Sequence, residues 1–146
     1  MSADKLRILP AESASVGVAL DEERLREMHR LKTGALLQAS VMMGAACGHI
    51  SATAWTALSA YGAALGLAFQ VVDDILDVTQ DSTTLGKTAG KDVASQKATY
   101  PSIVGLERSR HIAKRLTNRA FDALKVFPGQ ATALEALATY LLNRDR

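Results

Sequence analysis

The stretch that decides the fold reads Phe69-Gln70-Val71-Val72-Asp73-Asp74-Ile75-Leu76-Asp77, which sets three carboxylates into an apolar helical run. At 100° per residue, Asp77 lies about 40° and Gln70 about 60° around the helix axis from Asp73, and Asp74 lies about 100° away. One side of the helix therefore carries four oxygen donors. Ionised carboxylates this close repel one another and are costly to desolvate, so an inward-facing cluster needs cations.

Magnesium is the cation that this acidic cluster predicts. It prefers oxygen ligands, keeps several waters and usually binds one or two carboxylates together with substrate phosphates. The alternative interpretation is a solvated helix face, which is the common setting for acids on a helix. Apolar side chains flank the acids on both sides, which is unlike a face made for water.

Composition predicts one folded domain over residues 1–146. The chain is 48% hydrophobic and 22% charged, which is enough apolar material for a core. A net charge of +2 is too small to indicate binding to nucleic acid. No export signal is recognisable and polar residues interrupt the apolar runs, so we expect a cytoplasmic protein without a membrane span. Cys47 lies among Met, Ala and Gly and is expected to be a small buried hydrophobe.

The order of helix signals predicts an all-α helical bundle. Residues 1–20 form an irregular lead-in, and a first helix begins at Asp21 and continues to about residue 47. A second helix, capped by Ser51 or Thr53, ends near residue 81, and a loop of nearly twenty residues follows. A third helix runs from Pro101 to about residue 126, and a fourth follows Pro128-Gly129. No useful β-alternation appears.

Lysines flank the acidic helix in the sequence. Lys32 precedes a mostly apolar helical stretch, and Lys87 and Lys97 lie in the long loop after the acids. Each can be a solvated surface lysine, which is the usual case, or a cation aimed at a polar pocket. Beside an acidic metal site, loop lysines can close over a Mg²⁺-bound diphosphate.

Four segments together resemble one family. They are His29-Arg30-Leu31-Lys32-Thr33-Gly34-Ala35-Leu36, Gly66 to Asp77, the loop Gly86-Lys87-Thr88-Ala89-Gly90-Lys91-Asp92, and Lys97-Ala98-Thr99-Tyr100-Pro101. In this order and spacing they resemble the C-terminal half of the trans-isoprenyl diphosphate synthases, most closely the bacterial farnesyl diphosphate synthases. The resemblance implies the all-α isoprenoid synthase fold and a Mg²⁺-dependent prenyltransferase that joins an allylic diphosphate to isopentenyl diphosphate.

The resemblance also implies roles for individual residues. Asp73, Asp74 and Asp77 would hold one Mg²⁺ on the departing diphosphate. Lys32, Lys87 and Lys97 would bind its oxygens, Thr33 and Gln70 would face the developing cation, and Phe69 would lie near the isopentenyl diphosphate site. Lys32, Thr33, Gln70 and Asp73 are thus the expected catalytic residues.

The sequence departs from the family in one respect. No second Asp-Asp-x-x-Asp occurs in the 146 residues, whereas the family carries another such motif in its N-terminal half. The chain can be a truncated synthase, one component of a two-piece enzyme or a fragment of a larger protein. We expect a homo-oligomer or a partner that supplies the missing half, and little turnover without it. The alternative is a non-catalytic helical partner or remnant that binds Mg²⁺ and diphosphate weakly.

Overall fold

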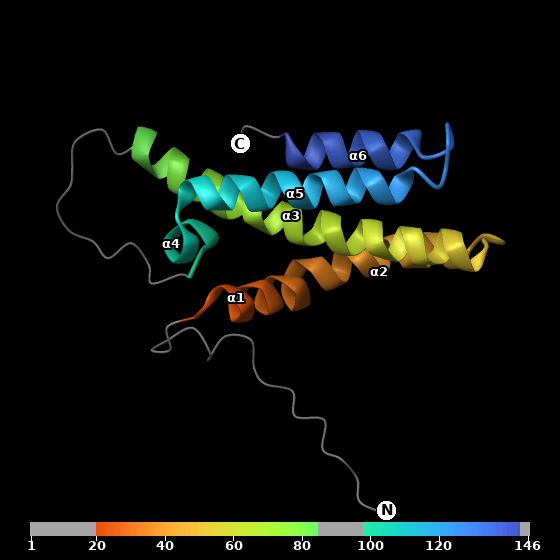
Figure 1. Cartoon of the computed structure of the whole chain (residues 1–146), viewed down its shortest axis with the longest axis horizontal. Helices are drawn as coiled ribbons and strands as arrows, with labels where there is room; N and C mark the ends of the chain where they lie inside the picture. The colour runs from red at the N-terminus through yellow and green to blue at the C-terminus, as the bar shows by residue number, and fades with distance from the viewer. Residues whose placement is uncertain (1–19, 85–97, 144–146) are drawn as a thin grey trace, which may run out of the picture.

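The computed structural model describes residues 20–84 and 98–143, and within these ranges the chain is helical with no strand (Figure 1). The predicted all-α class is confirmed. The elements are α1 (Glu22–His29), the π-helical segment η1 (Arg30–Gly34), α2 (Ala35–Ala46), α3 (Ala52–Thr84), α4 (Tyr100–Val104), α5 (Leu106–Leu124) and α6 (Thr132–Leu142). The expected irregular lead-in lies almost wholly outside the described residues.

Helix α3 is the centre of the structure. The Ser51 side chain caps it by accepting from the Ala54 N–H at 3.1 Å, as predicted. α5 and α6 pack on one side of α3, and η1 and α2 pack on the other (Figure 1). By length and composition α3 could cross a membrane, but half of its apolar window is buried inside the fold. That burial fits a core helix.

The hydrophobic core lies between α3 and α5 and is closed by α1, α4 and α6. Its largest fully buried apolar side chains are Tyr61, Tyr100, Leu25, Leu65, Leu124 and Val71. Fully buried members of the core come from every helix except η1 and α2. The apolar side of α3 that faces α5 is therefore the centre of this core, while η1 and α2 pack on the other side of α3.

Two of the predicted helices are interrupted. The first contains η1, whose wider π-helical turns separate α1 from α2 at Arg30–Gly34. The third is divided at Gly105, which ends α4 and precedes α5 with φ of 83°, a left-handed value that glycine adopts without strain. The expected burial of Cys47 was wrong, because the residue is exposed after the end of α2.

Glycines allow η1 and α2 to approach the backbone of α3. A Cβ on Gly66 would lie 2.6 Å from the Cα of Gly34, and a Cβ on Gly62 would lie 2.9 Å from the Cα of Gln38. The Gln38 side-chain amide donates to the Ser59 hydroxyl at 3.0 Å in the same interface. Both close contacts are to backbone atoms, so a larger residue cannot be accommodated by rotating a side chain.

We expect Gly66→Ala to destabilise the fold and Gly44→Ala to do the opposite. The added methyl at Gly66 must separate two helix backbones, and overpacking of this kind costs about 1–3 kcal/mol. Gly44 lies in α2 with nothing within 4 Å of an added Cβ, so the change to alanine gains up to about 1 kcal/mol of helix propensity. Urea unfolding of both variants measures the difference. Equal effects at the two positions would contradict the close packing.

Tyr61 connects α3 to α6. Its hydroxyl donates to the Leu134 carbonyl at 2.7 Å, and burial raises the pKa of the phenol from 10.0 to about 12. The folded state therefore favours the protonated phenol.

This shift predicts a pH dependence of stability. Below about pH 10 the phenol is protonated in both the folded and the unfolded state. Between pH 10 and the folded pKa of about 12, the unfolded chain loses the proton first, so the free energy of unfolding falls as pH rises. Tyr61→Phe should remove this part of the fall and cost about 1 kcal/mol at neutral pH. Denaturation curves on both sides of pH 10 compare the two proteins, and parallel pH profiles would contradict the role of Tyr61.

Candidate functional site

Three contacts fix how the first helical segments run along α3. His29 contacts Asp74, Gly34 lies against Gly66, and Gln38 contacts Ser59. The residue numbers rise on one side as they fall on the other, so α1, η1 and α2 run antiparallel to α3. The part of η1 between His29 and Gly34 therefore lies over the turns of α3 between Gly66 and Asp74.

This register brings together two of the predicted motifs. Lys32 and Thr33 lie in η1, and Phe69, Gln70 and Asp73 lie on the facing turns of α3. Lys32 is exposed, and the other four are half-buried. These exposures place the five residues at the edge of the packed helices. A π-helical turn is often found at functional positions, and here it contains the Lys-Thr pair.

The other two predicted lysines, Lys87 and Lys97, fall outside the described residues. The segments that carry the remaining predicted site residues are described, and they pack against each other as η1 and α3.

Asp73 and Asp77 fit a hydrated magnesium ion. They lie four residues apart on the same side of α3, with Asp73 half-buried and Asp77 exposed. Across residues 20–84 and 98–143, no three His, Cys, Asp or Glu residues come together to hold a metal by themselves. Mg²⁺ does not require such a cage, because it keeps waters and shares substrate phosphates. Two neighbouring carboxylates at an accessible edge match that chemistry.

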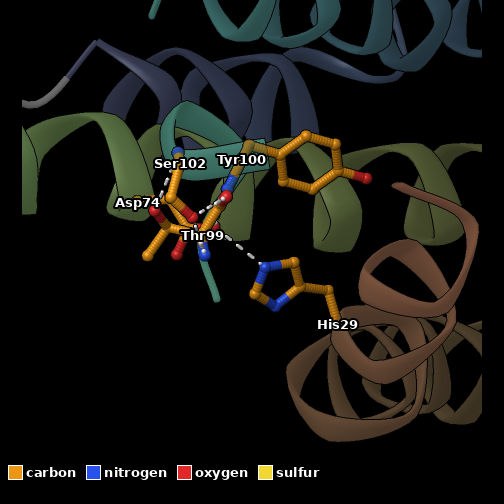
Figure 2. A network of polar contacts seen from close by, with 5 residues as sticks. All are labelled: His29, Asp74, Thr99, Tyr100 and Ser102. Carbon is orange, nitrogen blue, oxygen red and sulfur yellow. Dashed lines mark hydrogen bonds and ion pairs between the residues drawn. The ribbon is translucent and has the colours of Figure 1, made fainter. Parts of the chain in front are cut away.

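Asp74 points in a different direction from the other two acids. It is 2% exposed, and its Oδ2 accepts from the Tyr100 backbone N–H at 3.0 Å and lies 3.0 Å from His29 Nε2 (Figure 2). His29 is 3% exposed, and its ring stacks on the Tyr100 ring with centroids 5.7 Å apart. The buried carboxylate thus connects α1, α3 and α4.

The start of α4 is fixed by its own side chains as well. Thr99 and Ser102 form a capping box, in which each side chain accepts from the backbone N–H of the other at 3.3 and 2.9 Å (Figure 2). Pro101 occupies the first turn, as the sequence predicts. Burial raises the pKa of the Tyr100 phenol to about 12, with the negative charges of Glu22 and Asp74 adding to the effect. The ring therefore stays neutral at physiological pH.

Sequence reasoning assigned no role to His29 or Tyr100. A signal was present at Asp74, because Val71 precedes it by one helical turn and is fully buried. An acid on the same side of a helix as a core valine is expected to point inward, where it needs a donor. The partners themselves were not predictable, because they lie 45 and 26 residues away in sequence.

Comparison with known proteins shows the family to which this chain belongs. The family model for polyprenyl synthetases matches residues 9–128. The chain is 48% identical over 123 residues to geranylgeranyl pyrophosphate synthase 12, chloroplastic, of Arabidopsis thaliana, covering 84% of this chain and 34% of the relative. It is 50% identical over 113 residues to a Sinorhizobium fredii protein named "Probable farnesyl diphosphate synthase", covering 75% and 34%. The chain belongs to the polyprenyl synthetase family.

Solved structures agree with this assignment. A geranyltransferase of Legionella pneumophila superposes with a TM-score of 0.73 at 31% identity, covering 91% of this chain and 41% of that one. A Helicobacter pylori geranyltransferase complexed with magnesium and isoprenyl diphosphate gives 0.66 at 35% identity, covering 87% and 42%. The fold is that of the isoprenyl diphosphate synthases. The chain spans about a third of the length of the curated relatives it matches.

Proposed function

We propose that the chain supplies one half of the active site of a trans-prenyltransferase that condenses an allylic diphosphate with isopentenyl diphosphate. The observation that carries the proposal is the antiparallel register, which sets Lys32 and Thr33 of η1 opposite Gln70 and Asp73 of α3. A cationic group and a carboxylate pair at one accessible edge suit a magnesium-bound diphosphate. The family relationship supports the same reaction class.

The proposed reaction separates a negative leaving group from a positive allylic fragment. The allylic carbon–oxygen bond breaks, its electron pair leaves with the diphosphate, and the double bond of isopentenyl diphosphate attacks the allylic cation. Loss of a proton then restores a double bond. Mg²⁺, when bound by Asp73 and Asp77, neutralises charge on the leaving diphosphate. The barrier lies in charge separation, so fixed groups that stabilise either charge accelerate the reaction.

The residues of this chain would divide those tasks. Lys32 presents an ammonium group to the diphosphate oxygens, and the proposal adds Lys87 and Lys97 to the same role. The Thr33 hydroxyl and the Gln70 amide oxygen would turn their negative ends toward the cation. Phe69 would contribute an apolar surface near the isopentenyl diphosphate site and help to exclude water, which would quench the cation.

Farnesyl diphosphate is the product that overall likeness to the bacterial enzymes favours. Relatives named for geranylgeranyl and for farnesyl products match the chain at 48% and 50% identity, so identity alone does not separate the two. The preference therefore rests on the motif resemblance.

A second candidate function is favoured by the surface of η1 and α2. Leu31, Leu36 and Met43 are 60%, 67% and 63% exposed, and Ala45 is the only buried residue among the twelve of α2. An almost wholly apolar helix covered on one side needs another layer. We therefore propose association with a second copy or with a partner that supplies the other half. In this alternative the chain alone is a non-catalytic helical subunit with weak affinity for Mg²⁺ and diphosphate.

Asp73→Asn should weaken magnesium-dependent binding of inorganic pyrophosphate to the 146-residue chain. Removing the charge from a ligand of the ion should lower the affinity by more than about tenfold. Isothermal titration with pyrophosphate, with and without Mg²⁺, measures the change. Glu135→Gln is a matched control, because Glu135 is exposed on α6, which does not contact η1. Equal affinities of the wild-type chain with and without Mg²⁺ would refute the metal site.

Prenyl transfer by the chain alone tests whether the proposed site is complete. We expect turnover near the background rate, because Lys32, Asp73 and Asp77 supply only one side of a site that must hold two diphosphates. Incorporation of labelled isopentenyl diphosphate into acid-labile product measures the rate. Robust turnover by the chain alone would exclude the non-catalytic candidate and would show that the site is complete.

A further inference from the structure

We propose that Asp74 is a positioning residue that holds Lys32 and Asp73 in register, and that it is not a ligand of the divalent cation. This inference rests on the proposed function for its ligand, pyrophosphate with Mg²⁺. The geometry that carries it lies within the described helices and does not depend on a bound ion.

The first step is the environment of the carboxylate. Asp74 is 2% exposed, and one oxygen, Oδ2, contacts both the Tyr100 N–H and His29 Nε2 at 3.0 Å. Mg²⁺ gives up its waters reluctantly and therefore needs open space around a carboxylate ligand. Asp74 offers no such space without separating α1 and α4 from α3. Asp73 is half-buried and Asp77 is exposed, so neither is enclosed as Asp74 is.

The second step is how the buried carboxylate is satisfied. Asp74 Oδ2 accepts from the Tyr100 backbone N–H and contacts His29 Nε2, so two groups of the chain itself already hold this oxygen. His29 Nδ1 is buried and has no hydrogen-bond partner among the described residues, so the contact of Nε2 with Asp74 is the polar contact that orients the ring.

The third step is what the network holds in place. His29 is the last residue of α1, immediately before η1, and Lys32 follows three residues later. Asp74 adjoins Asp73 on α3, and Tyr100 is the first residue of α4. One carboxylate therefore fixes the segment that carries the proposed diphosphate-binding lysine against the turn that carries the proposed metal ligand. Outer-shell groups of this kind typically change metal affinity by about ten- to hundredfold when removed.

The test compares Asp74→Ala with Asp74→Asn. Alanine removes both hydrogen bonds, whereas the amide oxygen of asparagine can accept from Tyr100 and His29 but carries no charge. Isothermal titration with inorganic pyrophosphate and Mg²⁺ should show a loss of about ten- to hundredfold for Asp74→Ala. Asp74→Asn should recover the affinity to within about threefold of the unchanged chain. Hydrogen exchange of the Tyr100 amide reports the network directly, and should be fast in Asp74→Ala and slow in Asp74→Asn.

A second comparison uses Lys32→Ala in both backgrounds. If Asp74 acts by positioning Lys32, the lysine substitution weakens binding strongly in the unchanged chain and little in Asp74→Ala. A purely stabilising role for Asp74 would lower the melting temperature of Asp74→Ala but leave the pyrophosphate affinity of the folded chain unchanged, which would overturn the proposal.

Other results would also overturn it. If Asp74→Asn binds as weakly as Asp73→Asn while the Tyr100 amide stays protected, Asp74 is a metal ligand. If Asp74→Ala does not fold, the comparison of Asp74→Asn with Asp73→Asn still decides. If the unchanged chain shows no magnesium-dependent affinity for pyrophosphate, the proposed function fails. Hydrogen exchange of the Tyr100 amide in Asp74→Asn and Asp74→Ala then still tests the network.

Discussion

The contact between the backbones of Gly34 and Gly66 is the constraint on which the site depends. No side chain fits between them, so η1 lies directly on α3 and cannot slide by a residue without placing a side chain in the gap. The contact of His29 with Asp74 fixes the other end of the same segment. Between these two points the π-helical turn has little freedom. The relative position of Lys32 and Asp73 is therefore set by packing that contains neither residue.

The acids Asp73, Asp74 and Asp77 are close in the sequence but have different surroundings, because a helix turns by 100° per residue. Asp73 is half-buried and Asp77 is exposed, four residues apart on one side of α3, where our proposal places the cation. Asp74 lies on the side of Val71, inside the core, where burial of a charge is offset by two hydrogen-bond donors. The Asp-Asp-x-x-Asp spacing thus combines a structural carboxylate with a pair suited to metal. In our proposal Asp73 and Asp74 are coupled, because a substitution at one of them displaces the other.

Much of the fold followed from local pattern. The apolar period, the Ser51 and Asp21 caps and the break after Pro128-Gly129 predicted the helices, and α3 ends within three residues of the expected position. The interruptions were harder. Gly105 was not recognised as a break, and the π-helical turn at Arg30–Gly34 leaves no periodic signal over five residues. The exposure of Cys47 depends on how many helical layers cover α2, and composition does not give that number. The His29, Asp74 and Tyr100 network required contacts distant in sequence. Lys87 and Lys97 fall outside the described residues, so their roles stay predictions.

The distribution of buried residues distinguishes the helices that form the core from the surface beside the proposed site that stays uncovered. The fully buried core residues lie on the α5 and α6 side of α3 and on α1 and α4, and α2 adds the partly buried Val41 to this interior. The opposite side, where η1 and α2 lie, carries Lys32 together with the exposed Leu31, Leu36 and Met43. An apolar surface beside the proposed diphosphate site is where a further helical layer would both bury those residues and enclose the substrate. The same missing layer would therefore account for the uncovered hydrophobic surface and for an allylic site that has one side. In our proposal, a chain that spans about a third of its relatives thus forms a core and takes the rest of its site from another chain or segment.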